Sequence, residues 1–132
     1  MKTNIGFNNR QFLTKKEWLT YLKRMPVRYI RKKKTEFCEI CLKPPLDKNP
    51  LENSHIIAFR KGIVDFALTP DFLDENTNIL SAHKIKCNKS AELSTSEICR
   101  KLIKMNIHKL PNFLPEETLK VWNSLFSNKI VD

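Results

Sequence analysis

The stretch 38–62, CEICLKPPLDKNPLENSHIIAFRKG, contains a Cys-x2-Cys pair, a histidine inside a short apolar run and one of the two glycines of the chain. In a reducing compartment such a pair more often binds zinc or does redox work than forms a disulfide. Redox chemistry of thioredoxin type needs the pair to open a helix, but Pro44 and Pro45 follow it closely. We therefore interpret Cys38 and Cys41 as half of a tetrahedral zinc site, with small apolar filler residues as the alternative.

The other half of the zinc site is expected downstream, because zinc needs four thiolate or imidazole ligands. His83 and Cys87 are four residues apart, a spacing that lets two ligands converge on one ion. Cys99 competes for the fourth place, although it lies between Ile98 and Leu102 in an apolar helical pattern. We expect His83 to be the ligand, and a structural zinc ion to contribute on the order of 10 kcal/mol or more to folding.

Length and charge indicate the class of protein. The chain has 132 residues, which suits a single domain over 1–132, and its 24 Lys and Arg against 14 acids give a formal charge of +10. A field of that sign favours phosphate-rich partners, with nucleic acid first and an anionic membrane surface as the competitor. No run of about 18 apolar residues occurs and no apolar signal segment follows Met1, so we expect a cytoplasmic (intracellular) protein without a membrane partner.

The pattern of caps and apolar spacing predicts an α+β chain. Helices are predicted over 15–25 after a Thr14–Glu17 capping box, briefly from Cys87, over 95–107 after a Ser94–Glu97 box, and from Pro115 onward. Strands are predicted over 51–59 and 76–82, with a turn at 60–62 and a loop over 63–75 between them. The last helix carries Leu119, Trp122 and Phe126 on one face, which we expect to be core; contact with a second copy in a homodimer is the alternative.

A basic arm is predicted near the N-terminus. Residues 15–34 hold nine cations and one acid, Glu17, with Trp18, Tyr21 and Tyr29 between them. We expect phosphate contact there, and a merely solvated charged face is the alternative. The predicted nucleic-acid-binding residues are Lys23, Arg24, Arg28, Arg31, Lys32, Lys33, Lys34, Arg60, Lys61 and Lys89.

Three pieces in this order, CEIC at 38–41, LENSHIIAFRKG at 51–62 and NTNILSAHKIKCNKS at 76–90, resemble the HNH endonuclease family. The resemblance covers 38–90 and implies a small ββα-metal unit, treble-clef-like, held together by structural zinc. It divides the chain into a basic N-terminal helix and arm over 1–37, the HNH core over 38–93 and C-terminal helices over 94–132. The third motif residue is Asn, so the resemblance is to an HNN-type variant.

Carried over by position, the resemblance implies three catalytic residues. His55 would be the general base that deprotonates water, Asn78 would hold the hairpin loop and orient that imidazole, and Asn88 would bind the catalytic Mg²⁺ or Mn²⁺. Asn76 is the alternative to Asn78. Ser54 stands where the family usually has Asp or His as a second metal ligand.

The serine leaves three outcomes open: a metal held through water, a replacement acid from Glu52 or the 65–75 loop, or lost activity. The function expected is hydrolysis of phosphodiester bonds in DNA by a metal-dependent endonuclease, of phage, mobile-element, restriction or phage-defence type. The alternatives are a catalytically silent zinc-bound nucleic-acid-binding module and a nuclease that acts on RNA.

Overall fold

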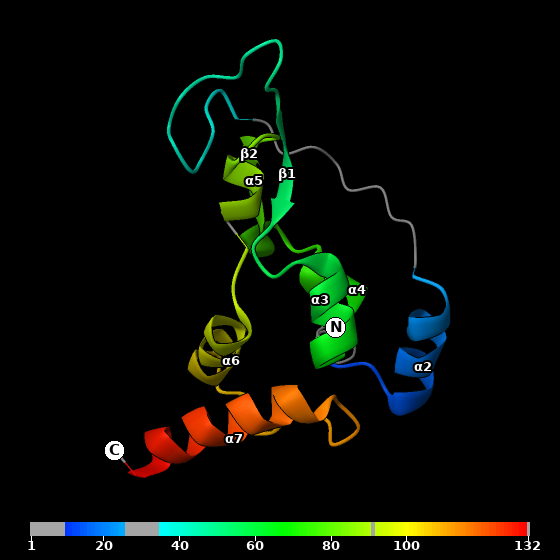
Figure 1. Cartoon of the computed structure of the whole chain (residues 1–132). Coiled ribbons are helices and arrows are strands. Elements are labelled where there is room, and N and C mark those ends of the chain that lie inside the picture. The colour runs from blue at the N-terminus through cyan, green and yellow to red at the C-terminus, as the bar shows by residue number, and fades with distance from the viewer. Residues whose placement is uncertain (1–9, 26–34, 91, 132) are drawn as a thin grey trace, which may run out of the picture.

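The computed structural model describes residues 10–25, 35–90 and 92–131. It is a mixed α+β structure with one two-stranded antiparallel sheet in the part of the chain described, as the sequence predicts (Figure 1). The elements are α2 (Lys15–Lys23), β1 (Leu51–His55), α3 (Phe59–Phe66), α4 (Pro70–Leu73), the 3-10 turn η1 (Asn76–Asn78), β2 (Ile79–His83), α5 (Cys87–Ser90), α6 (Thr95–Lys104) and α7 (Glu116–Val131). Figure 1 shows the sheet and α5 at one end of the molecule, and α2, α6 and α7 at the other.

The sheet brings the two halves of the 38–90 stretch together. β1 pairs with β2 so that Leu51 faces His83 and His55 faces Ile79. Both strands are shorter than the predicted ones, since β1 ends at His55 and β2 starts only after η1. His55 therefore lies at the end of the pair from which the segment that connects the strands departs.

That connecting segment is helical, so the predicted turn at 60–62 and loop over 63–75 are wrong. Ile63 and Phe66 are fully buried on one face of α3, and Gly62 is buried beside them. A Cβ atom at Gly62 would lie 2.5 Å from Cδ2 of Leu73, so the glycine serves the close approach of α3 to α4 rather than a turn. Thr69 caps α4 by accepting a hydrogen bond from the Phe72 backbone.

The predicted capping boxes are both present. Thr14 and Glu17 exchange hydrogen bonds at the start of α2, and Ser94 and Glu97 do so at the start of α6. The bond from the Thr14 backbone, and then the Arg10 side chain, lower the pKa of Glu17. The backbone and hydroxyl of Ser94 likewise lower the pKa of Glu97. The helices end earlier than predicted, α2 at Lys23 and α6 at Lys104.

Two separate apolar clusters stabilise the structure. The larger one, which we call the helical core, gathers buried side chains from α3, α4, α6 and α7. Its largest fully buried side chains are Phe66, Ile57, Ile63, Leu68, Leu73, Ile98 and Leu102. Trp122 is only 3% exposed in it and stacks on Phe126, which confirms the predicted core face of α7. The smaller cluster holds Cys38, Leu51 and Ala82, with Cys87 against them. We call the part of the chain around it, residues 35–55 and 79–90, the sheet lobe.

Among the described residues, none of the helices combines the length and apolar character needed to cross a lipid bilayer.

Candidate functional site

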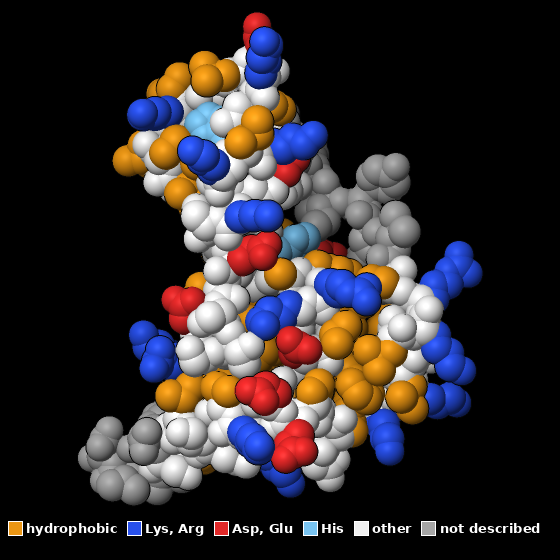
Figure 2. Space-filling model, viewed as in Figure 1, with side chains coloured by type: hydrophobic (Ala, Val, Ile, Leu, Met, Phe, Trp, Pro, Cys, Tyr) orange, Lys and Arg blue, Asp and Glu red, His pale blue; other side chains and the backbone are white. Residues whose placement is uncertain are grey.

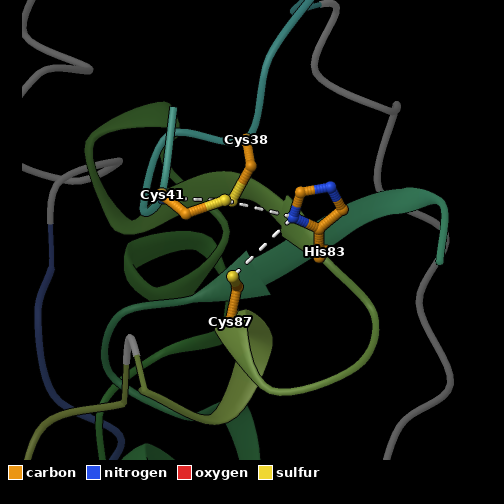
Figure 3. Close-up of side chains that lie close together, drawn as sticks. All are labelled: Cys38, Cys41, His83 and Cys87. Atoms are coloured by element: carbon orange, nitrogen blue, oxygen red, sulfur yellow. Dashed lines mark hydrogen bonds between the residues drawn. The ribbon is translucent and has the colours of Figure 1, made fainter. Parts of the chain in front are cut away.

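The sheet lobe contains a cluster of metal-ligating side chains. Cys38, Cys41, His83 and Cys87 each place one ligand atom within 4.8 Å of the others (Figure 3). Nδ1 of His83 is 3.4 Å from the Cys41 sulfur and 3.7 Å from the Cys87 sulfur. A tetrahedron with zinc bonds of about 2.3 Å to sulfur and about 2.0 Å to nitrogen has S···N edges of about 3.5 Å. The four residues are therefore close enough to bind a metal ion, and their chemistry is consistent with structural zinc.

Local backbone geometry aims these ligands inward. The backbone N–H groups of Ile40 and Cys41 point at the Cys38 sulfur, at 3.4 and 3.5 Å. His83 ends β2, and its Nε2 lies 2.9 Å from the Pro44 carbonyl oxygen, which can only accept; Nε2 must then carry the proton, and Nδ1 is left for the metal. Lys86 has φ 74°, and this left-handed residue turns the chain so that Cys87 can begin α5.

The thiols of the cluster differ in acidity. Burial opposes ionisation of Cys38, but hydrogen bonds from the backbone of Cys41, His83 and Ile40 outweigh it and lower its pKa to about 6. Burial, together with hydrogen bonds and charge from Cys38 and Cys41, raises the pKa of Cys87 to about 11. Because zinc binds thiolates, loading the site must release protons, and its affinity for zinc should fall as the pH is lowered.

Cys99, the alternative fourth ligand, lies elsewhere. It is fully buried in the helical core beside Ile98 and Leu102, where burial raises its pKa to about 11. The structure therefore brings His83, and not Cys99, together with Cys87 and the Cys-x2-Cys pair, close enough to bind a metal ion as the sequence predicts.

His55, the predicted general base, is the last residue of β1 and pairs with Ile79, at the other end of the sheet from the Leu51–His83 pair. Its Nε2 is 3.0 Å from Oδ1 of Asp74, and its ring packs against Phe59 with centroids 5.6 Å apart. The side chains of His55 and Asp74 are 18% and 13% exposed. Asp74 follows α4 directly and is the C-cap residue of that helix.

Asn78 is buried and joins two backbone segments. Its side-chain oxygen accepts a hydrogen bond from the Ile57 N–H at 2.8 Å, and its amide donates to the carbonyls of Ile57 and Leu73. Asn76, the alternative motif residue, is exposed. Of the two, only Asn78 holds the chain that leaves β1 against the end of α4.

Ser54 and Asn88 lie together, but not as two open metal ligands. The buried Ser54 hydroxyl donates to the Asn88 backbone carbonyl at 3.1 Å. The Asn88 side-chain amide donates to Oε1 of Glu52, two residues before Ser54 and on the same face of β1. His55 thus contacts Asp74, whereas Asn88 contacts Ser54 and Glu52. Among the described residues no hydrogen bond joins His55 to Asn88, so these contacts form two separate groups rather than one network.

The predicted nucleic-acid-binding residues are spread over several elements. Lys23 and Arg24 are exposed at the end of α2, Arg60 is exposed on α3, and Lys89 is exposed on α5. Lys61 forms an ion pair with Asp65 at 3.4 Å. Figure 2 shows Lys and Arg side chains over both the sheet lobe and the helical part. Arg28, Arg31, Lys32, Lys33 and Lys34 lie outside the described residues.

Sequence reasoning did not single out Asp74. The stretch 65–75 carries four acids, Asp65, Asp71, Asp74 and Glu75. Because this stretch is predicted to be a loop, nothing in the sequence indicates which of the four would contact His55. The available signal was Thr69–Pro70, a helix-start pattern that places the end of a short helix near Asp74. Glu52 appeared only as one of several replacement acids.

Comparisons with protein-family models, with curated proteins and with solved structures found no match for this chain. Its function must therefore be inferred from the geometry of its own residues.

Proposed function

We propose that the protein is a metal-dependent endonuclease of HNH type that hydrolyses phosphodiester bonds, with DNA as its substrate. The observation that carries the proposal is the placement of Asn78: it is buried and ties the segment after His55 to the end of α4, the loop-holding role that the resemblance implies for it. The order β1, β2, α5, with a Cys₃His cluster at the far end of the sheet, also supports a ββα-metal unit.

The residues beside α5 suit a hard divalent cation. Glu52 offers a carboxylate and Asn88 an amide oxygen, once that amide turns over so that its oxygen takes the place of the nitrogen that now donates to Glu52. Ser54 is committed to the Asn88 carbonyl, so we assign the acidic ligand to Glu52 and give Ser54 the task of holding α5 against β1. Bound Mg²⁺ or Mn²⁺ supplies positive charge for the phosphate oxygens and the leaving 3′ oxygen.

His55 suits the role of base because an imidazole nitrogen with a free lone pair can accept a proton and part of the His55 side chain is exposed. It would accept a proton from the attacking water while exposed basic side chains such as Arg60 and Lys89 hold the phosphate backbone. The positive charge of the chain predicts that binding weakens steeply as salt is raised.

The test is incubation of supercoiled plasmid, single-stranded DNA and structured RNA with the zinc-loaded protein in Mg²⁺, Mn²⁺ or EDTA. We expect cleavage of DNA that EDTA abolishes and that His55→Ala reduces about 10²- to 10⁴-fold. The matched control is His108→Ala, because His108 is exposed and contacts Phe126 on α7. Equal activity of the two variants would refute His55 as the base.

A second candidate, a catalytically silent nucleic-acid-binding module, is favoured by one observation. Ser54 stands where the family usually has Asp or His as a metal ligand, and its hydroxyl donates a hydrogen bond to the Asn88 carbonyl instead of being open to a cation. Salt-sensitive binding of DNA by folded, zinc-loaded protein, without cleavage of any polymer in either cation, would support this function instead. Cleavage of RNA alone would change the substrate and keep the chemistry.

A further inference from the structure

We propose that Asp74 is a positioning residue for His55: it accepts the Nε2–H of the imidazole and so leaves Nδ1 as the nitrogen that takes the proton from water. The assignment deepens the proposed nuclease function and rests on it for its catalytic meaning. The contact that carries it, 3.0 Å between Nε2 and Oδ1, stands independently of that function.

The chemistry of the acceptor determines the tautomer. An ionised carboxylate can only accept hydrogen bonds, so the ring nitrogen that faces Asp74 must carry a hydrogen. In a neutral imidazole the other nitrogen then holds the lone pair. The His55 ring also packs against Phe59, which limits rotation of the imidazole away from Asp74. The pair is mostly shielded from water, which strengthens the bond relative to an exposed one.

Asp74 is itself held in place by the fold. Its backbone N–H donates to the Pro70 carbonyl at 2.9 Å, and the preceding carbonyl, that of Leu73, accepts from the buried Asn78 amide at 2.8 Å. Leu73 is fully buried against Gly62 of α3. A chain of contacts therefore runs from Asn78 through Leu73 to Asp74 and His55. Through it, Asn78 can orient the imidazole without touching the ring.

The proton balance of the step is simple. Water gives one proton to Nδ1 of His55, and its oxygen forms the new bond to phosphorus as the bond to the 3′ oxygen breaks. The ring becomes an imidazolium, whose charge the Asp74 carboxylate stabilises while remaining ionised. The 3′ oxygen leaves with a proton from solvent, and the imidazolium returns its proton to solvent.

The experiment is long-range ¹H–¹⁵N correlation NMR of the zinc-loaded, ¹⁵N-labelled protein above neutral pH, for wild type, Asp74→Ala and Glu75→Gln. Glu75 is the matched control: it is exposed, adjacent in sequence, and its side chain makes no capping hydrogen bond. In wild type and Glu75→Gln we expect the Nε2–H form of His55, with slow exchange of that proton. In Asp74→Ala we expect mixed tautomers and fast exchange.

Kinetics give the second readout. Asp74→Ala should lower kcat about 10- to 10²-fold, the cost of misplacing a catalytic group by ~1 Å, with KM for DNA little changed. Wild-type His55 protonated on Nδ1, or a tautomer and exchange rate that Asp74→Ala does not alter, would overturn the proposal. The wild-type spectrum decides even if the variant does not fold. Absence of cleavage with the expected spectra would refute the nuclease function while upholding the pairing.

Discussion

At the scale of single residues, Asn78 makes the contacts on which the candidate site most depends. Three backbone polar groups, the N–H and carbonyl of Ile57 and the carbonyl of Leu73, lose their partner if its side chain is removed. Ile57 and Leu73 are fully buried, so water does not easily replace the lost bonds.

We therefore expect Asn78→Ala to lower the free energy of unfolding by at least about 3 kcal/mol, because three buried groups would lose their partner and each such group costs about 1–3 kcal/mol. Urea unfolding of the zinc-loaded protein measures the change. Asn76→Ala is the control, since Asn76 is exposed, and its effect should stay within about 0.5 kcal/mol. Equal losses in the two variants would mean that Asn78 does not hold the loop.

Substitution of Glu52 tests the cation site that we propose beside α5. We expect Glu52→Gln to weaken Mn²⁺ binding at least about 10-fold, as loss of even an outer-shell partner commonly does. Electron paramagnetic resonance of Mn²⁺ titrated into zinc-loaded protein measures the affinity without any need for cleavage. Glu92→Gln removes an exposed acid a few residues beyond α5 and should change nothing. An unchanged affinity for Mn²⁺ in Glu52→Gln would show that Glu52 is not a ligand of this cation.

At the scale of elements, the helices show where local signals succeed. The Ser94–Glu97 box identifies the start of α6 because its hydrogen bonds join residues only three apart. The 60–62 stretch shows the opposite case: Arg, Lys and Gly in a row indicate a turn, yet Gly62 lies inside α3, where its missing side chain makes room for Leu73. Nothing within the stretch reveals a neighbour eleven residues away.

For α6 we expect Ser94→Ala to cost about 1 kcal/mol, the usual effect of losing a serine N-cap. Ser124→Ala, an exposed position inside α7, is the control and should be neutral or slightly stabilising because alanine has the higher helix propensity. Thermal and urea unfolding of both variants would show the difference. If Ser94→Ala lowered the free energy of unfolding no more than Ser124→Ala, the N-cap would not stabilise α6.

At the scale of the whole molecule, the two apolar clusters differ in what they can hold together. The helical core has many fully buried large side chains, whereas the cluster of the sheet lobe consists of Cys38, Leu51 and Ala82 with Cys87 against them. An apolar cluster that small contributes little, so we expect the sheet lobe to depend on a metal ion bound by Cys38, Cys41, His83 and Cys87.

Removal of zinc by a selective chelator should therefore act unevenly. We expect hydrogen exchange to accelerate over 36–55 and 79–90, while amides of α6 around Leu102 stay protected. Cys38→Ser should reproduce the pattern and lower the zinc content, whereas Cys99→Ala should retain about one equivalent of zinc because Cys99 lies in the helical core. Uniform loss of protection along the chain would show that the metal stabilises both parts equally.

The sequence by itself determined the features that depend on short spacings: the Cys-x2-Cys pair, the His83–Cys87 pair, the two capping boxes and the apolar face of α7. Ligand spacing and helical periodicity are local, so they can be recognised from neighbouring residues alone. Tertiary structure decided that Asp74 contacts His55, that Glu52 contacts Asn88 and that Ser54 closes onto α5. Those contacts join residues 19 to 36 positions apart. The helices α3 and α4 follow β1 in the sequence, and their packing brings Asp74, at the end of α4, back to His55.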